Sequence, residues 1–111
     1  MAIKANIVID QGTDFSATID VTDSNDDPFD LTNFTPAAQM RKSYASETAY
    51  DFTVVDNGPQ GQINLSMPSE LTNTIAPGRY LYDVEITSNA GNVSRVVEGI
   101  VTVTPGITRI T

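Results

Sequence analysis

A chain of 111 residues has the length of a single domain, and its fourteen acidic and six basic residues give a formal net charge of −8. Cysteine and histidine are both absent, which excludes disulfides, thiolate metal sites and catalysis by a histidine base. The acidic balance disfavours binding to nucleic acid or to an anionic membrane surface, and no apolar run is long enough for insertion into a membrane.

The N-terminal segments alternate between apolar and polar residues, which is typical of half-buried strands. Residues 1–4 lack the long apolar segment of a signal peptide, so none is expected. A first strand is predicted over residues 3–9, with a turn at 10–13. A second strand over residues 15–21 has one apolar and one polar face, which favours an antiparallel sheet lying on a core.

Apolar residues after the next loop are predicted to close one end of the core: Phe29, Leu31 and Phe34. A strand over residues 35–43 follows them. Pro36 near its start indicates either an edge position or a strand that begins just after it, because proline cannot donate a main-chain hydrogen bond.

The middle of the chain reads as a hairpin followed by a helical turn. Strands are predicted over residues 49–55 and 62–67, and the Asn-Gly-Pro-Gln-Gly sequence within residues 56–61 predicts a widened loop between them. Residues 68–75 then change to the spacing of one helical face. Ser69 is the expected N-cap of this single turn.

The clearest alternation is in residues 78–86, where two tyrosines, a valine and an isoleucine share one face. This segment is predicted to be the central strand. Residues 93–104 form the last strand, but their apolar residues do not keep one parity. Either a bulge near Glu98 and Gly99 or burial of both faces would explain that irregularity.

About seven short strands separated by turn signals, with one short helical turn, predict an all-β fold: an immunoglobulin-like β-sandwich of antiparallel strands formed by one domain, residues 1–111. In such folds a corner tyrosine stands two residues before the second cysteine. Tyr80 occupies the first of these places and Tyr82 the second, with its ring expected to pack towards Ile19. Two ordinary core tyrosines would give the same pattern.

Four aspartates in and after the loop at 23–28 are the candidate cation ligands: Asp23, Asp26, Asp27 and Asp30. Calcium prefers several oxygen ligands, but this spacing lacks the glycine and glutamate of an EF-hand loop. A solvated turn is therefore the favoured interpretation, and no metal site is predicted.

Asp83 and Glu85 share a strand face, so their carboxylates are near neighbours. A glycosidase uses such a pair of neighbouring carboxylates. Nothing in the sequence supplies a cleft or raises the pKa of either group, and no ordinary catalytic triad can form without histidine. We therefore expect no enzymatic activity, no catalytic residue and no cofactor.

Four of the six basic residues lie on predicted strands or beside them: Arg41, Lys42, Arg79 and Arg95. They are expected to form scattered surface pairs with Asp83, Glu85 or Glu98 across strands, and a patch facing a partner is the minority interpretation.

Four segments, taken in order, resemble the N-terminal (BppU-type) domain of phage baseplate upper proteins, most closely the versions in phages of cyanobacteria. The segments are Phe29-Asp30-Leu31-Thr32, Ala38-Gln39-Met40-Arg41-Lys42, Pro77-Gly78-Arg79-Tyr80-Leu81-Tyr82-Asp83-Val84 and Val97-Glu98-Gly99. The family usually has glycine after Leu-Thr, where this chain has Asn33. Asparagine tolerates a positive φ, so the turn can be kept.

The resemblance implies an immunoglobulin-like domain in a structural protein of a tailed-phage virion, assembled in the host cytoplasm. It implies a tail or baseplate component that docks to other virion structural proteins through sheet edges, end loops and the tail at residues 107–111. Pairing of edges would give a homo-oligomer. The alternatives are a head or neck decoration protein and a module that binds carbohydrate on a host surface, for which Tyr44 and Tyr50 are the candidate aromatic platform.

Overall fold

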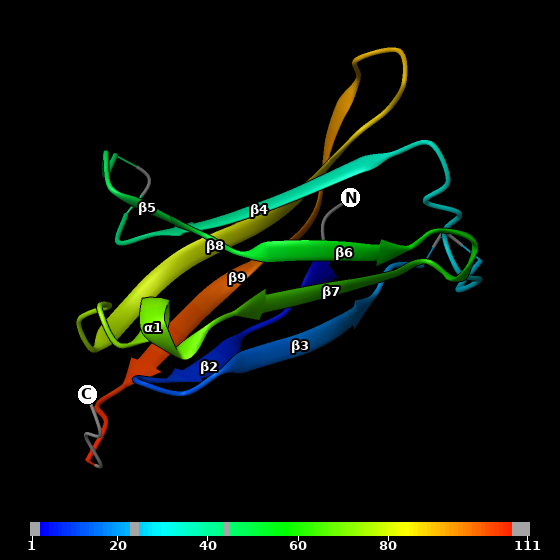
Figure 1. The fold of residues 1–111 in the computed structure, drawn as a ribbon. Coiled ribbons are helices and arrows are strands. Elements are labelled where there is room, and N and C mark those ends of the chain that lie inside the picture. Colours follow the sequence, from blue (N-terminus) through cyan, green and yellow to red (C-terminus); the bar gives the residue numbers. More distant parts are fainter. Residues whose placement is uncertain (1–2, 23–24, 44, 108–111) are drawn as a thin grey trace.

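Two β-sheets packed face to face make up the structure, a computed structural model that describes residues 3–22, 25–43 and 45–107 (Figure 1). The larger sheet has the order β1-β9-β8-β4-β5, with β2 also paired to β9, and the smaller sheet has the order β3-β7-β6. The strands of the larger sheet are β1 (Ile3–Lys4), β2 (Ile7–Asp10), β4 (Thr35–Arg41), β5 (Ala49–Asp51), β8 (Gly78–Thr87) and β9 (Val93–Thr104). Those of the smaller sheet are β3 (Phe15–Asp20), β6 (Thr53–Asn57) and β7 (Gln62–Met67). The predicted immunoglobulin-like β-sandwich is confirmed.

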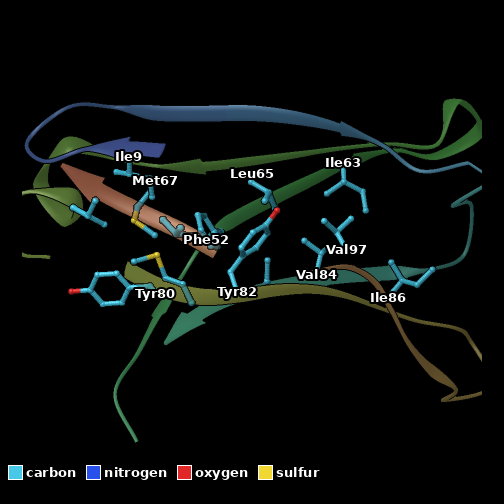
Figure 2. Close-up of a cluster of buried hydrophobic side chains, with 14 of the residues drawn as sticks. Ile9, Phe52, Ile63, Leu65, Met67, Tyr80, Tyr82, Val84, Ile86 and Val97 are labelled. Carbon is cyan, nitrogen blue, oxygen red and sulfur yellow. The ribbon is translucent and has the colours of Figure 1, made fainter. Parts of the chain in front are cut away.

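The core lies between the sheets and is built from alternate residues of each strand. Tyr80, Tyr82, Val84 and Ile86 of β8 are all buried, and β8 lies between β9 and β4. The prediction of a central strand is therefore confirmed. Figure 2 shows these side chains facing three buried residues of β7 across the interior: Ile63, Leu65 and Met67.

The hydroxyl of Tyr80 forms a tyrosine corner. It donates a hydrogen bond of 2.6 Å to the carbonyl oxygen of Ala76, four residues upstream. The ring of Tyr82, where a cysteine would stand in an antibody domain, lies 6.1 Å from the ring of Phe52 in an edge-on arrangement. The corner interpretation is confirmed over that of two ordinary core tyrosines.

The N-terminal segment pairs in parallel with β9, which corrects the expectation that all strands run antiparallel. The single strand predicted over residues 3–9 is divided into β1 and β2 at Ala5 and Asn6. There the carbonyl oxygen of Ala5 accepts a hydrogen bond of 2.5 Å from the hydroxyl of Tyr82, and Asn6 Oδ1 accepts one of 3.0 Å from the main-chain N–H of Ile100. These long-range bonds interrupt a pattern that looks continuous in the sequence.

Gly99 is required by this close approach and not by a bulge. A Cβ atom at Gly99 would lie 2.1 Å from the carbonyl oxygen of Ala5. The bulge of β9 is instead at Val96, because Val84 pairs with Val97 while Glu85 pairs with Arg95. The placement predicted near Glu98 and Gly99 is therefore wrong. Burial of both faces is wrong too, since Ile100 is 37% exposed whereas its neighbours of the other parity are buried.

The strand predicted over residues 49–55 is divided between the two sheets. Its first half, β5, pairs with β4 in the larger sheet, and its second half, β6, pairs with β7 in the smaller one. The crossing occurs at Phe52, whose N–H donates to the carbonyl oxygen of Ala38 at 3.1 Å. The buried ring of Phe52 packs between Phe15 and Tyr82, with centroids 6.0 Å and 6.1 Å away. Side-chain alternation is continuous across such a crossing, so the sequence does not reveal it.

The predicted hairpin with a widened loop is confirmed as β6, the short 3₁₀ segment η1 (Gly58–Gln60) and β7. Gly61 has a φ of 67°, and a Cβ there would lie 2.7–2.8 Å from main-chain atoms of Phe29 and Val21. The loop therefore needs glycine both for its conformation and for its close contact with the main chain of Val21 and Phe29.

The predicted closure of one core end is confirmed. Leu31 is buried, and the rings of Phe29 and Phe34 lie 5.7 Å apart against the core. Asn33 has a φ of 71°, so asparagine adopts the left-handed turn conformation that the family resemblance led us to expect at this place.

The predicted helical turn is α1 (Ser69–Thr72), but its N-cap is Pro68 and Ser69 is its first residue. The prediction of Ser69 as the cap is wrong because a distant carboxylate takes that role. Asp14 Oδ1 accepts a hydrogen bond of 2.7 Å from the N–H of Ser69. Thr72 is fully buried, and its hydroxyl donates to the carbonyl oxygen of Thr13 at 2.7 Å. Both bonds tie α1 to the turn before β3.

Two further findings concern the chain ends and the membrane. Ile107 is 93% exposed. The rest of the predicted tail, residues 108–111, lies outside the described residues. Within residues 3–22, 25–43 and 45–107, no helix has the length and apolar character needed to cross a membrane.

Candidate functional site

The acidic loop forms a turn at the surface. Asp26 and Asp30 are exposed, and Asp23 lies outside the described residues. Asp30 Oδ1 accepts a hydrogen bond of 2.9 Å from the N–H of Thr32, and hydrogen bonds from Thr32 lower the pKa of the Asp30 carboxyl. In the described part of the chain, no three histidine, cysteine or acidic side chains are grouped so that they could hold a metal ion.

The predicted carboxylate pair lies on the outer face of the larger sheet. Asp83 is held by Arg95, whose Nε lies 3.0 Å from Asp83 Oδ2, and Arg95 also reaches Glu98 at 3.4 Å. The nearby carboxylate of Asp83 is the main cause of the raised pKa of Arg95. The predicted pairing of Arg95 with acids across strands is confirmed, and it engages Asp83 in a surface ion pair.

Of the two candidate platform tyrosines, Tyr44 lies outside the described residues. Tyr50 is half-buried, and its ring meets the ring of Tyr80 edge-on at 6.1 Å. The Nζ of Lys42 lies 4.8 Å from the centre of the Tyr80 ring, a cation–π contact. These aromatic rings therefore pack mainly on one another.

A depression of about 560 Å³ on the outer face of the larger sheet is the main feature that the sequence did not reveal. Side chains from four strands line it. They include Lys4 of β1, Gln39 and Arg41 of β4, Leu81 and Asp83 of β8, and Arg95, Glu98 and Ile100 of β9. We call this surface the sheet depression. Its lining residues run from Lys4 to Ile100, 96 positions apart in the chain, so strand pairing is needed to bring them together.

The charge of the sheet depression is opposite to that of the whole chain. Three basic residues line it against two acidic ones, although the chain carries −8. Arg95 is paired with both acids. Among the described residues, Arg41 bonds only neutral groups, the carbonyl oxygen of Ser46 at 2.7 Å and Gln39 Oε1 at 3.2 Å. Lys4 forms no ion pair with any residue that the structure describes. Lys4 and Arg41 therefore have no acidic partner in the part of the chain that the structure describes.

The structure separates the four predicted basic residues. Arg41 and Arg95 line the sheet depression, and Lys4, which the sequence did not single out, joins them. Lys42 points to Tyr80 instead, and Arg79 is exposed outside the depression. The sequence could have placed Lys4 in this group only if the pairing of β1 with β9 had been known.

A second, acidic depression of about 450 Å³ adjoins the first around the outer side of β4. Its lining includes three carboxylate residues, Asp51, Asp83 and Glu85, and no basic residue. Gln39 lines both depressions and donates a hydrogen bond of 2.6 Å to Asp51 Oδ1. The outer face of the larger sheet thus presents a basic area beside an acidic one.

No protein-family model matches the sequence, and no curated protein matches it. Solved structures do resemble the fold. An internalin-like protein of Listeria monocytogenes is 18% identical, with a TM-score of 0.52 over 93% of this chain and 28% of the other. The SrpA adhesin of Streptococcus sanguinis is 15% identical, with a TM-score of 0.53 over 89% of this chain and 54% of the other. The chain therefore spans about half or less of these proteins, and the likeness shows the fold alone.

Proposed function

We propose that the protein is a non-catalytic docking module of a tailed-phage virion, a component of the tail or baseplate. It binds an acidic segment of a neighbouring structural protein through the sheet depression. The observation that carries this proposal is the gathering of Lys4, Arg41 and Arg95 beside Leu81 and Ile100 on a chain that is otherwise strongly acidic. Opposite local charge favours encounter and sets the orientation of two partners, and apolar contact supplies part of the affinity.

The virion assignment rests on the family resemblance of the four sequence segments. The immunoglobulin-like fold agrees with it, and so does the left-handed conformation of Asn33 at the position where the family usually has glycine. The carbohydrate-binding alternative has weaker support, because Tyr50 is half-buried and packs against Tyr80, and Tyr44 lies outside the described residues.

Mass spectrometry of purified virions tests the assignment. We expect the protein in intact particles, and in the tail fraction after heads and tails are separated. Absence from particles would overturn the virion role. Recovery with the heads would overturn the tail placement in favour of head or neck decoration.

A pair of charge reversals tests the surface. Lys4→Glu lies in the sheet depression, whereas Arg79→Glu is exposed outside it and changes the net charge by the same amount. In a pull-down against disassembled virion proteins, Lys4→Glu should lose the partner and Arg79→Glu should retain it. Equal loss in both variants would show that only net charge matters, and equal retention would show that the partner binds elsewhere.

A further inference from the structure

One edge strand of the smaller sheet, β3, has an open side. Among the strands that the structure describes it pairs only with β7, and Figure 1 shows it as the outer strand of that sheet. Val21, which continues the same register, donates its N–H to the carbonyl oxygen of Gly61 at 2.7 Å. Bonded and non-bonded pairs alternate in an antiparallel ladder. The odd residues of β3 therefore bond to β7, and Ser16, Thr18 and Asp20 direct their main-chain groups away from it.

The other edges offer fewer unpaired main-chain groups than β3 does. At the β4 edge of the larger sheet, β5 pairs with residues 39–41 of β4. The bond from the N–H of Phe52 to the carbonyl oxygen of Ala38 shows that the even-numbered residues of β4 direct their main-chain groups to this edge. The next such residue is Pro36, which has no N–H to offer, as the sequence predicted for an edge. On β6 only Val54 and Asp56 face outward, because its odd residues pair with the β7 residues that face away from β3. At the other edge of the larger sheet, β1 and β2 are only two and four residues long, and the pairing is interrupted between them.

The apolar side chains of β3 are also incompletely covered. Phe15, Ala17 and Ile19 are only half-buried. Their partners on β7, in contrast, are at most 1% exposed: Met67, Leu65 and Ile63. A strand added beside β3 would cover these side chains and pair three residues whose main-chain groups now face outward.

We propose that a second copy of this chain occupies the open side of β3, with the two β3 strands antiparallel about a two-fold axis at Thr18. In this arrangement Thr18 faces Thr18 of the other copy, and Ser16 faces Asp20 in both directions. All six pairs of outward N–H and C=O groups then find partners. On the inner face, Ala17 meets Ile19, so the apolar surface continues across the axis.

The charges on β3 select this register. Two antiparallel registers use the strand fully, one centred on Thr18 and one centred on Ala17. Centring on Ala17 places Asp14 directly opposite Asp20 twice, and like charges directly opposite are destabilising. Centring on Thr18 opposes no two like charges. The self-complementary pattern of Ser16, Thr18 and Asp20 is the reason to choose a second copy over a different partner.

The pair should be reversible. One strand pair of this length buries less than the roughly 1,200 Å² of a standard stable interface. Each copy also carries −8, so repulsion opposes association until salt screens it. We expect a dimer that forms at high protein concentration and is strengthened by added sodium chloride. This inference extends the proposed docking role, but it concerns a different surface from the sheet depression, so either can fail while the other stands.

Single-cysteine variants test the register, because the chain has no cysteine of its own. In the proposed dimer the two Cα atoms of residue 18 lie about 5.5 Å apart, within the roughly 4.4–6.8 Å of disulfides. The Cα atoms of residue 16 lie about 14 Å apart, since four residues separate them along the strand. At a protein concentration at which the dimer forms, Thr18→Cys should therefore become disulfide-linked under mild oxidation about tenfold or more faster than Ser16→Cys, because only the thiols at residue 18 are held within bonding reach. Equal rates for the two variants would overturn the register.

Sedimentation of cysteine-free variants gives an independent test. Thr18→Lys places two positive charges together at the axis, while Thr53→Lys makes the same change on the exposed face of β6. We expect the wild type and Thr53→Lys to dimerise with rising concentration, and Thr18→Lys to stay monomeric with an unchanged melting temperature. A wild type that stays monomeric at millimolar concentration and high salt would overturn the proposal, as would capture of Thr18→Cys by another virion protein instead of its own copy.

Discussion

Two tyrosine hydroxyls on β8 connect the core to distant main chain. Tyr80 bonds the carbonyl oxygen of Ala76 at 2.6 Å, and Tyr82 bonds that of Ala5 at 2.5 Å. Ala76 is exposed, whereas Ala5 is half-buried next to Gly99. Water can therefore replace the first bond more readily than the second, and the two hydroxyls should contribute unequally to stability.

We expect Tyr82→Phe to lower the free energy of unfolding by about 1–3 kcal/mol, because it leaves the Ala5 carbonyl without its partner. Tyr80→Phe, the matched control, should cost about 0.5–1.5 kcal/mol, the net value of one hydrogen bond. Urea unfolding at neutral pH measures both. A loss for Tyr80→Phe larger than that for Tyr82→Phe would contradict this ranking.

The same two tyrosines should make the stability of the protein depend on pH in the alkaline range. Burial raises the pKa of Tyr82, and burial together with the neighbouring Tyr50 raises the pKa of Tyr80. In the unfolded chain tyrosine titrates near pH 10, so above that pH the unfolded state releases protons that the native state keeps. The stability due to these groups is thus complete below about pH 10 and is lost as the pH rises through the folded pKa values. Tyr82→Phe should lose stability less steeply above pH 10 than the wild type does.

At the scale of elements, α1 depends on a residue that its local sequence does not contain. Asp14 accepts the N–H of Ser69 from 55 positions away, while the Ser69 side chain makes no cap bond. A carboxylate at this place satisfies an otherwise unpaired donor and interacts favourably with the helix dipole.

We therefore expect Asp14→Ala to destabilise the protein by about 0.5–2 kcal/mol, the usual cost of losing an N-cap, and Ser69→Ala to cost only a few tenths. Thermal unfolding of the two variants provides the measurement. If Ser69→Ala proved the more damaging change, the capping role assigned to Asp14 would be wrong.

At the scale of the whole molecule, the first and last strands lie side by side. β1 and β2 pair with β9, and β8 joins β9 to the rest of the larger sheet. Contacts between such distant parts of the chain require large loops to close, and the entropy of loop closure is lost before the contacts stabilise the fold.

Folding should consequently be slow for a chain of this size, on the order of milliseconds to seconds, as for other sandwiches dominated by non-local pairing. Stopped-flow refolding monitored by tyrosine fluorescence gives the rate. Complete refolding within microseconds would be inconsistent with this topology.

The predictable part of the fold was the part that side-chain alternation reports. β3, β7 and β8 each show a clear period of two over most of their length, and their inward residues are those that the pattern indicated. The turn at Asn57 and Gly58 followed from local backbone chemistry. The positive φ of Asn33 was expected from the family resemblance, because asparagine tolerates the conformation that the family's glycine adopts. The spacing of Tyr80 and Tyr82 was compatible with a tyrosine corner, but only the hydrogen bond from Tyr80 to Ala76 distinguished it from two ordinary core tyrosines.

The unpredicted features all depend on which strands become neighbours. Three of them change the strand pairing but not the alternation of apolar and polar residues: the crossing at Phe52, the interruption at Ala5 and the bulge at Val96. The candidate site also depends on strand neighbours, because Lys4 and Arg95 line the same depression only through the parallel pairing of β1 with β9.

By itself, the sequence determined an all-β chain without cysteine or histidine, the faces of its main strands and the positions of its tight turns. These follow from interactions among residues close together along the chain. Only the tertiary structure decided that the N-terminal strands run parallel to the last one, that basic residues gather on an acidic molecule, and that β3 is left with an open side. Those outcomes depend on hydrogen bonds between distant segments, and an alternating pattern carries no information about its partner.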